Sequence, residues 1–415
     1  MTVLQIHCRY RHAKGGEGSV VDDECDLLRQ NGHTVEQFFG DNGEMPIGSA
    51  LAVARSAMLS WWNPSAYRSV EAAITHLHPN IVHVHNTFAA LSPSIFWAAK
   101  HSGVPVVLTV HNYRLLCATG LLLRDGAPCQ ECVGRWPVAA VQHRCQFSSS
   151  SAIGACTAVG QALHRILNTY NRAVDAFVAL TEFQRALLIR GGFPGQRIHV
   201  KPNSARDFPV NAKGQSREKQ IVFVGFVGRI KGIDLLLSAW ETIEHRGFRL
   251  VIIGDSLEAA DIRRQFAEVR DVDWRGPQPR EVTLAEVRRS RWLALPSRWY
   301  EGFPVAIAEA LQQGTPVLVP NHGSFPEIVE DGKNALLFPP NDIAGLARAL
   351  SLAMTMESTP WEALSCSARQ HYLSRYCSDV NYRRLIEIYS AAQDHAAHAP
   401  QSTPGPAVGR TGLTP

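Results

Sequence analysis

The feature that most constrains the fold of this 415-residue chain is an alternation of short apolar runs with amphipathic stretches, which occurs in both halves of the sequence. In the first half the runs rich in β-branched residues, which we predict to be strands, are Val3–Cys8, Thr34–Phe39, Ile81–His85, Val106–Val110, Ala176–Leu180 and Arg197–Lys201. The stretch Ser19–Gln30 is typical of an amphipathic helix, and Gly32 can end it. Strands that alternate with helices indicate βαβ units and a parallel sheet.

The second half repeats this rhythm. Its predicted buried strands are Gln220–Gly225, Arg249–Ile253, Trp292–Leu295 and Pro316–Val319. Its predicted helices are Ile233–His245, Leu284–Ser290, Pro304–Gln313 and Ile343–Met354. Two such halves predict an α/β fold of two Rossmann-like, doubly wound parallel-sheet domains. Because ligands bind at the carboxyl ends of the strands in these sheets, we expect the two edges to face each other across a cleft.

The domain boundaries follow from composition. The segment Pro202–Arg217 is rich in Pro, Asn, Ser and Gly, and we interpret it as the linker. The predicted domains are therefore residues 1–203 and 204–380. We expect a last helix over 381–395 to pack back on the N-terminal domain. The segment 396–415, rich in Pro, Gly and Ser, is predicted to be disordered.

Composition excludes several classes of protein. Apolar residues make up 45% of the chain and charged residues 19%, which is typical of a globular protein. The net charge of +4 is too small to indicate nucleic-acid binding, but it suits an anionic substrate or membrane surface. The sequence shows neither a signal peptide nor an apolar run of about 18 residues, so we expect a cytoplasmic protein whose nine cysteines are reduced thiols.

The segment Glu301–Ala310 carries the strongest functional signal. Pro304 fits the first turn of a helix that is apolar on nearly every face, so Glu309 would be a buried carboxylate. Burying it without partners is costly, and two ribose hydroxyls would satisfy it well. The alternative is that Glu309 pairs with a structural arginine or a backbone amide. The free N–H groups at the start of this helix would suit a diphosphate.

Three stretches of this half follow a known pattern. Residues Glu301–Glu309 read E-G-F-P-x-x-x-x-E, Ala310–Val317 read A-L-x-x-G-x-P-V, and Gly323–Leu337 read G-x-x-P-E-I-V-x-D-G-x-N-A-L-L. This resembles the retaining GT-B glycosyltransferases of family 4, and weaker similarity covers most of residues 1–390.

The resemblance implies a function and a set of donor-binding residues. It implies transfer of a sugar from a UDP- or GDP-sugar to a saccharide or polyprenyl-linked acceptor in cell-surface polysaccharide synthesis. Glu309 would hold the donor ribose and Glu301 the donor sugar, while backbone amides of Gly302, Phe303 and Pro304 would meet the sugar and the phosphates.

A basic pair follows the first predicted strand of the second half. Fixed cations beside a departing diphosphate lower the barrier without a metal. In similar enzymes the pattern G-R-L-x-x-x-K-G supplies one arginine and one lysine, and Lys231 falls on the lysine. Phe226 stands at the arginine position, however, and the next arginine is Arg229. We predict Lys231 and Arg229 as catalytic cations; the alternative is a solvated turn that carries two charges.

Glycines follow the first strand at Gly15, Gly16 and Gly18. A dinucleotide fingerprint would need Gly or Ala near Val21, so a nicotinamide cofactor is not indicated. The glycines instead predict a loop whose backbone can approach a phosphate or the acceptor. The resemblance implies that this loop lies opposite the donor; a plain tight turn is the alternative.

Histidines end two strands of the first half. His111 follows Val106–Val110, where an imidazole can hydrogen-bond a sugar hydroxyl, and the resemblance places it against the transferred sugar. His85 and Asn86 end another strand and are candidate acceptor-binding residues. A lone histidine is more often structural than functional.

Cysteines gather in an insert at about 113–150. The C-x-x-C pair in this insert is typical of a zinc knuckle, and His143 is a further candidate ligand. The predicted ligands of a structural zinc are Cys117, Cys129, Cys132 and Cys145, with free buried thiols as the alternative.

We predict no cofactor and no divalent metal for catalysis. The one Asp-x-Asp motif, Asp271-Val272-Asp273, does not follow a predicted strand and is therefore poorly placed for the cleft.

The stretch Leu51–Arg68 combines Trp61 and Trp62 with arginines. It suits peripheral contact with the inner face of the cytoplasmic membrane, but an apolar helix packed on its own domain is the favoured alternative. Two other functions remain open at this level: a sugar-nucleotide epimerase of the same architecture, and a non-catalytic sugar-nucleotide-binding protein.

Overall fold

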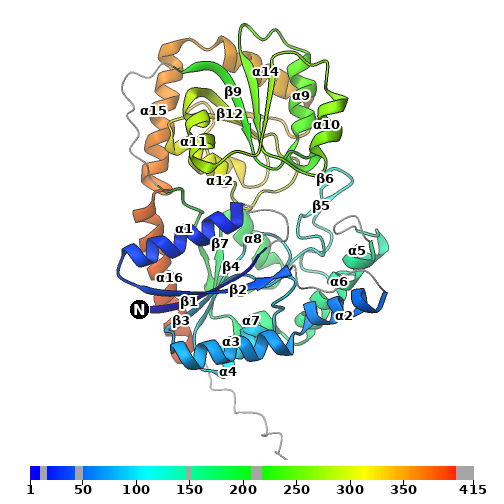
Figure 1. The fold of residues 1–415 in the computed structure, drawn as a ribbon, viewed down its shortest axis with the longest axis vertical. Helices are drawn as coiled ribbons and strands as arrows, with labels where there is room; N and C mark the ends of the chain where they lie inside the picture. Colours follow the sequence, from blue (N-terminus) through cyan, green and yellow to red (C-terminus); the bar gives the residue numbers. More distant parts are fainter. Residues whose placement is uncertain (10–15, 43–49, 146–150, 207–216, 399–415) are drawn as a thin grey trace, which may run out of the picture.

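The computed structural model describes residues 1–9, 16–42, 50–145, 151–206 and 217–398, and they form two stacked α/β domains (Figure 1). The first sheet has the order β2-β1-β3-β4-β7-β8. Its strands are β1 (Thr2–Arg9), β2 (Thr34–Asp41), β3 (Ile81–Asn86), β4 (Val106–Thr109), β7 (Ala176–Ala179) and β8 (Ile198–Val200). All of its strand pairs are parallel, with Thr2 opposite Thr34 and Val82 opposite Val106.

The second sheet has the order β11-β10-β9-β12-β13-β14 and is also parallel throughout. Its strands are β9 (Glu218–Val224), β10 (Arg249–Ile253), β11 (Val272–Gly276), β12 (Ser290–Ala294), β13 (Val317–Pro320) and β14 (Ala335–Phe338). The prediction of two Rossmann-like parallel-sheet domains is therefore confirmed. A short antiparallel hairpin of β5 (Leu123–Arg124) and β6 (Ala127–Pro128) projects from the first domain.

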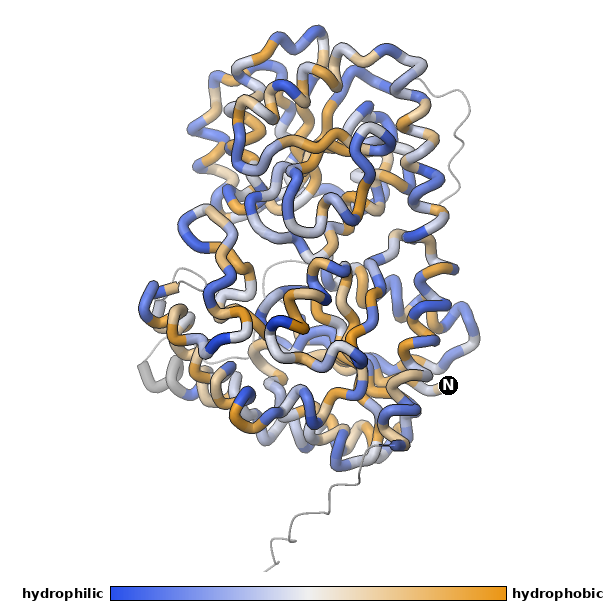
Figure 2. The backbone as a smooth tube through the Cα atoms, turned by 180° about the vertical axis from the view of Figure 1, so that it is seen from behind, coloured by the Kyte–Doolittle hydropathy of each residue, from blue (hydrophilic) through white to orange (hydrophobic). Residues whose placement is uncertain are grey.

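The helices of the first domain cover both faces of its sheet. They are α1 (Gly16–Gln30), α2 (Ala50–Trp61), α3 (Pro64–Leu77), α4 (Ser94–His101), α5 (Val138–Gln142), α6 (Ser151–Ile166), α7 (Thr169–Ala173) and α8 (Glu182–Arg190). Those of the second are α9 (Ile233–Glu241), α10 (Ala259–Gln265), α11 (Arg280–Arg289), α12 (Val305–Gln312), α13 (Phe325–Ile328), α14 (Ile343–Thr355) and α15 (Ser358–Arg375). Figure 2 shows hydrophobic colour concentrated inside each domain and hydrophilic turns around it.

The last helix, α16 (Ser378–His398), returns to the first domain (Figure 1). Its buried residues Leu385, Ile388, Tyr389 and Ala392 form one apolar cluster with residues of β1, β3, β4 and β7. This helix therefore covers one face of the first sheet. The predicted disordered tail from 399 onward lies outside the described residues.

Each sheet has a topological switch point, where successive connections leave a strand in opposite directions. In the first sheet it lies between β1 and β3, and in the second between β9 and β12. The crevice outside such neighbouring strands is where open α/β sheets bind ligands. In the second domain, the loops that leave this point carry Lys231 and Glu301.

No helix in the described part of the chain is long and apolar enough to cross a membrane.

Candidate active site

Lys231 and Glu301 meet at the switch point of the second sheet. Lys231 lies in a 3₁₀ turn (Arg229–Lys231) after β9, and its Nζ donates to Glu301 Oε1 at 2.6 Å. Ser297 Oγ and Trp299 Nε1 donate to the same oxygen at 2.7 and 2.8 Å. Glu301 is only 4% exposed, so these three donors hold a buried carboxylate in one position. In the described structure all three bonds end on Oε1, which leaves Oε2 for a ligand hydroxyl.

Arg229 does not take part in this cluster. Its guanidinium is half exposed and donates to Asp234 at 3.2 Å and to Gln265 at 2.6 Å. The nearby Arg298, which the sequence reasoning missed, also pairs with Asp234 and donates to the carbonyl of Arg229. The structure therefore does not place Arg229 with Lys231, because Asp234 on α9 and Gln265 on α10 bind its side chain. A catalytic role for Arg229 stays a prediction.

Glu309 faces inward from α12 and pairs with Arg280. Arg280 Nε lies 3.0 Å from Glu309 Oε1, and Arg280 Nη1 lies 2.8 Å from a carboxylate oxygen of Asp23 on α1. Burial raises the pKa of Glu309, while Arg280 opposes that rise. The ion pair between Glu309 and an arginine, which the sequence left open as the alternative to ribose binding, is thus present. Arg280 also joins the two domains, because Asp23 belongs to the first. Arg280 is the first residue of α11, the helix that follows β11. This position just beyond the carboxyl end of a strand could have marked Arg280 as a candidate from the sequence.

The loop Glu301–Phe303 of the second domain is held by residues of the first domain. Tyr113 Oη donates to the carbonyl of Glu301 at 3.2 Å, and Asn203 Nδ2 donates to the carbonyl of Phe303 at 3.1 Å. A Cβ at Gly302 would lie 3.2 Å from the carbonyl oxygen of His111 and 3.3 Å from Leu180. A side chain at Gly302 would therefore have to displace one of these neighbours, at the point where this loop approaches the end of β4. This contact brings the predicted residues His111 and Glu301–Phe303 to one place, with Pro304 following as the N-cap of α12.

The glycine segment is partly helical instead of a loop. Gly15 lies outside the described residues, whereas Gly16 and Gly18 belong to the first turn of α1. A Cβ on Gly16 would lie 3.6 Å from Val305 Cγ2, at the start of α12. The N-terminal ends of α1 and α12 therefore lie against each other across the domains, and the N-terminus of a helix is the kind of site that binds phosphate.

His111 is joined to His85 on the neighbouring strand. His111 Nε2 lies 3.0 Å from His85 Nδ1. Burial, and then the proximity of His85, holds the pKa of His111 well below its usual value, so the imidazole is neutral. Asn86 uses its side-chain oxygen to accept from the backbone N–H of Phe88 at 2.9 Å, which gives it a structural role in the loop after β3.

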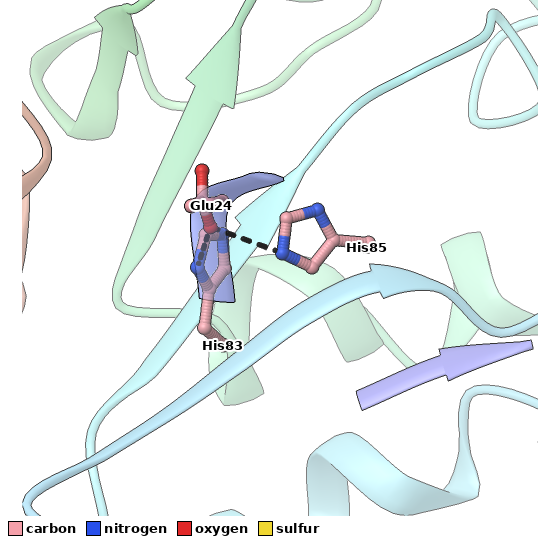
Figure 3. A group of neighbouring side chains, drawn as sticks. All are labelled: Glu24, His83 and His85. Carbon is pink, nitrogen blue, oxygen red and sulfur yellow. Dashed lines mark ion pairs between the residues drawn. The ribbon is translucent and has the colours of Figure 1, made fainter. Parts of the chain in front are cut away.

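The four cysteines of the predicted zinc site lie together, but in the described structure no three of their sulfur atoms lie within 4.8 Å of one another. Cys117, Cys129, Cys132 and Cys145 are free thiols around one cavity of about 20 Å³. Among the described residues, however, the group with three possible ligand atoms within 4.8 Å of one another is Glu24, His83 and His85 (Figure 3). His143 pairs with Glu131 at 2.8 Å. A tetrahedral zinc brings its ligands closer together than these sulfur atoms lie, so the structure gives the zinc no support.

The tryptophan-rich stretch is packed on one side and exposed on the other. Trp61 donates from Nε1 to the carbonyl of Cys156 at 2.9 Å and lies against Gly160 of α6. Met58 and Trp62 are 56% and 40% exposed. The packed helix that the sequence left as the alternative therefore accounts for Trp61, while membrane contact stays a prediction for the other two.

The Asp-x-Asp motif is directed away from the cleft. Asp271 precedes β11 and pairs with His245, and Asp273 lies within β11 and pairs with Arg275. The amino end of a strand is opposite the carboxyl edge at which ligands bind. This placement gives the motif no role in the cleft.

Two buried histidines at the switch point of the first sheet make stability depend on pH. Burial lowers the pKa of His7 to about 3 and that of His85 to about 4. In the unfolded chain these histidines bind protons near pH 6.5, whereas in the folded protein they stay neutral. Their contribution to the free energy of unfolding is therefore complete above pH 6.5 and is lost as the pH falls towards 4 for His85 and 3 for His7. We expect the free energy of unfolding to fall by roughly 2 kcal/mol per histidine between pH 7 and pH 5.

Urea denaturation at the two pH values measures this change. His7→Asn should remove its own share of the pH dependence, whereas His76→Gln, at an exposed position, should not alter it. A free energy of unfolding that is the same at pH 5 and pH 7 in the unsubstituted protein would contradict the burial of neutral histidines.

Comparison with known proteins relates this chain to a family of enzymes. The model described as Glycosyltransferase Family 4 matches residues 14–205, and the one described as Glycosyl transferases group 1 matches residues 218–355. The putative colanic acid biosynthesis glycosyltransferase WcaL of Escherichia coli is 24% identical over 270 residues, which cover 62% of this chain and 65% of WcaL. The D-inositol 3-phosphate glycosyltransferase of Mycolicibacterium smegmatis is 27% identical over 83% of this chain and 74% of its own.

Solved structures share the fold at low identity. Anabaena HepE in complex with UDP and glucose has a TM-score of 0.62 and 16% identity, covering 93% of this chain and 99% of HepE. Four of the curated relatives are matched over only 23 to 65% of their own length. The two family models nevertheless match the two sheets in turn. The chain is therefore a glycosyltransferase of the GT-B, group 1 / family 4 type.

Proposed function

We propose that this protein transfers a sugar from a nucleotide diphosphate to a saccharide or polyprenyl-linked acceptor in polysaccharide synthesis, with retention of anomeric configuration. The observation that carries the proposal is the Lys231–Glu301 pair at the switch point of the second sheet, held against His111 by the loop Glu301–Phe303. The UDP and glucose bound to HepE and the name of WcaL support the choice of donor and process.

Lys231 acts on the leaving group. As the bond between the sugar C1 and the phosphate oxygen breaks, its electron pair passes to the diphosphate and negative charge grows there. The ammonium of Lys231 and the N–H groups at the start of α12 stabilise this charge without a metal. The acceptor oxygen forms the new bond on the same face of the sugar, and its proton passes to the departing phosphate oxygen.

Glu301 and His111 hold the transferred sugar. Glu301 Oε2 can accept from a sugar hydroxyl while Oε1 remains fixed by its three donors. His111, neutral at the end of β4, accepts from another hydroxyl. These bonds keep the ring in place as it becomes oxocarbenium-like. Backbone groups of Gly302, Phe303 and Pro304 line the same loop.

Product analysis tests the function and the stereochemistry together. A thermal-shift screen of UDP-, GDP- and ADP-sugars identifies the donor, because a bound ligand stabilises by mass action. NMR of the product then reads the new linkage, and an α-linked donor should give an α-linked product. A β-linked product would rule out retention, and conversion of the donor to its epimer without an acceptor would indicate an epimerase.

Metal independence is part of the proposal. Activity should persist in EDTA, because Lys231 and the helix N-terminus take the diphosphate charge. Complete loss of activity that Mg²⁺ or Mn²⁺ alone restores would contradict it.

Peripheral contact with the inner face of the cytoplasmic membrane also belongs to this proposal. The exposed Met58 and Trp62 support it. Met58→Ser combined with Trp62→Ser should reduce co-sedimentation with anionic vesicles, and unchanged co-sedimentation would argue against this surface.

Substitution of Glu309 tests the ribose contact. We expect Glu309→Ala to weaken binding of the nucleotide by about 1–3 kcal/mol, because charged hydrogen bonds to ribose hydroxyls are lost. Calorimetry with the nucleotide measures the change. Arg280 is the alternative partner, so Arg280→Gln serves as the matched control: it frees Glu309 from the ion pair and should not weaken binding comparably. Equal affinity in a folded Glu309→Ala variant would remove the ribose assignment.

A further inference from the structure

A cavity of about 270 Å³ opens on the side of the first domain. It lies between the loop after β4, the cysteine insert, the end of α6, α7 and the turn after α8. All of the described residues that line it belong to the first domain, so it is separate from the donor site around Lys231 and Glu301. Its volume is close to the ~300–1,000 Å³ of sites that bind small ligands, so it has room for a small charged group.

Three arginines line this cavity, and none of its described lining residues is Asp or Glu. Arg165 donates to the carbonyls of Arg135 and Gly191, the second at 3.1 Å, which uses two of its five N–H donors. Arg114 lies with its guanidinium carbon 4.1 Å from the centre of the Phe88 ring. Among the described residues, no carboxylate pairs with Arg135 or Arg165. Because like charges around one cavity repel each other, an anion bound there would be stabilised.

The segment around the cavity carries only positive charge. Residues 132–174 contain four arginines and no Asp or Glu, although the whole chain has 41 basic and 37 acidic residues. Arg135 and Arg165 line the cavity, whereas Arg144 and Arg172 are exposed outside it. A guanidinium group matches the geometry of phosphate and binds it through two parallel N–H groups. The local charge therefore favours a phosphate group as the anion.

Four exposed apolar side chains, here called the apolar rim, stand beside the cavity. Trp136 and Val138 are 54% and 56% exposed, and Ile166 and Leu167 are 69% and 40% exposed. All four adjoin lining residues in the sequence, and the guanidinium carbon of Arg165 lies 5.8 Å from the centre of the Trp136 ring. Single exposed apolar residues are common, but apolar residues that gather with tryptophan and arginine are typical of surfaces at a membrane interface.

The apolar rim lies on the same side of the molecule as the tryptophan-rich stretch of α2. His164, which lines the cavity, has its Nε2 2.8 Å from the carbonyl oxygen of Trp61. Trp61 in turn donates to the carbonyl of Cys156 on α6, and the exposed Trp62 follows it. Figure 1 shows α2, α5 and α6 together at one edge of the first domain, away from α16. The two exposed apolar groups therefore belong to one surface.

We propose that the cavity binds the phosphate head group of an anionic membrane lipid, while the apolar rim enters the head-group layer beside it. Arg135 and Arg165 donate to the phosphate oxygens, and Arg114 adds positive charge from the loop after β4. A lipid is favoured over a soluble phosphate because the apolar rim loses contact with water only at a membrane. This inference rests on the proposed membrane contact but not on sugar transfer.

Co-sedimentation with vesicles tests the cavity. We expect the protein to bind vesicles that contain phosphatidylglycerol at least tenfold more tightly than vesicles of phosphatidylcholine alone. Arg135→Gln should weaken this binding roughly fivefold, and Arg135→Gln combined with Arg165→Gln roughly twentyfold. Arg172→Gln is the matched control, because it removes the same charge from the same segment outside the cavity, and it should weaken binding by less than about twofold. Equal losses in Arg135→Gln and Arg172→Gln, or equal binding to the two kinds of vesicle, would overturn the proposal.

Soluble phosphates distinguish the source of the head group. Trp136→Ser should weaken binding to phosphatidylglycerol vesicles roughly fivefold, because half-exposed apolar surface is no longer buried at the membrane. In calorimetry the same variant should bind glycerol 3-phosphate and inorganic phosphate as the unsubstituted protein does. Tight binding of either soluble phosphate, lost in Arg135→Gln, by a protein that does not bind vesicles would assign the cavity to a soluble ligand and overturn the lipid assignment.

Two further measurements separate this result from general damage and from the donor site. Thermal unfolding shows whether the arginine variants are folded; the Arg135 side chain makes no hydrogen bond in the described structure, so Arg135→Gln should keep the midpoint unchanged. Lys231→Ala should leave vesicle binding unchanged, because the donor diphosphate site lies in the second domain. A loss in Lys231→Ala as large as that in Arg135→Gln would place the lipid phosphate at the donor site and overturn the proposal. If no transfer is detected with any donor, vesicle binding still decides it.

Discussion

Substitution of Lys231 by alanine is expected to lower kcat for sugar transfer by ~100-fold or more, as loss of a preorganised charge beside a leaving group does. The ammonium is the cation that the structure fixes at the switch point of the second sheet, where it donates to Glu301 at 2.6 Å. Arg229 cannot replace it without leaving Asp234 and Gln265. The loss should appear in kcat more than in nucleotide affinity, because the charge on the diphosphate is greatest in the transition state.

Steady-state kinetics and calorimetry with the identified donor measure the two quantities. Lys219→Ala is the matched control, because Lys219 lies on β9 of the same sheet with its ammonium on an exposed carbonyl. Removing Lys231 also leaves the carboxylate of Glu301 with only neutral donors. The variant that combines Lys231→Ala with Glu301→Gln removes this unpaired negative charge as well, so it separates the effect of losing the ammonium from the effect of leaving the carboxylate unpaired. A kcat within about threefold of the unsubstituted enzyme would show that another group carries the leaving-group charge.

Substitution of Gly232 by alanine is expected to destabilise the protein by about 2–5 kcal/mol, the combined cost of a left-handed backbone and an overpacked contact. Gly232 has φ 71°, and a Cβ there would lie 1.9 Å from the carbonyl oxygen of Pro296. This backbone cannot move independently, because Gly232 follows Lys231 and Pro296 precedes Ser297, a donor to Glu301. Activity should therefore fall together with stability.

Gly276→Ala isolates the backbone part of this effect, and the difference between the two variants gives the steric part. Gly276 has φ 64°, but a Cβ there would meet nothing within 4 Å. Backbone strain alone should therefore lower the free energy of unfolding, by about 1–2 kcal/mol. Denaturant unfolding of both variants gives the comparison. If the two substitutions cost the same, the close approach of the turn to the loop after β12 does not constrain the site.

The sequence predicted the strands that form the centre of each sheet. All ten predicted strands overlap observed strands, because buried parallel strands are continuous apolar runs that end in turn residues. The edge strands β11 and β14 were missed. In β11, Val272–Gly276, charged residues alternate with apolar ones and every residue is only partly buried, so its composition does not differ from that of a loop.

The candidate site could be predicted where a charged residue comes soon after the carboxyl end of a predicted strand. Lys231 and Glu301 follow β9 and β12, and the sequence pattern alone placed both at a carboxyl edge. The side chain of Arg229 could not be placed from the sequence, because its position depends on Asp234, one turn further along, and on Gln265 of another helix. The cysteine insert does bring Cys117 and Cys145 to the C-x-x-C pair, around one cavity, but the described structure gives a zinc ion there no support.

The sequence by itself determined the two parallel sheets and the loops that carry Lys231, Glu301 and His111, because these depend on local periodicity and on where strands end. The linker Pro202–Arg217 stays a prediction, since most of it lies outside the described residues. Only the tertiary structure decided which groups meet: Glu309 with Arg280 and Asp23, and His111 with the pair of His85 and Glu24. These partners lie between 26 and 257 residues apart or on different elements, and their choice depends on burial. A carboxylate or an imidazole removed from water must take the partner that packing brings within about 3 Å, and no local pattern encodes that partner.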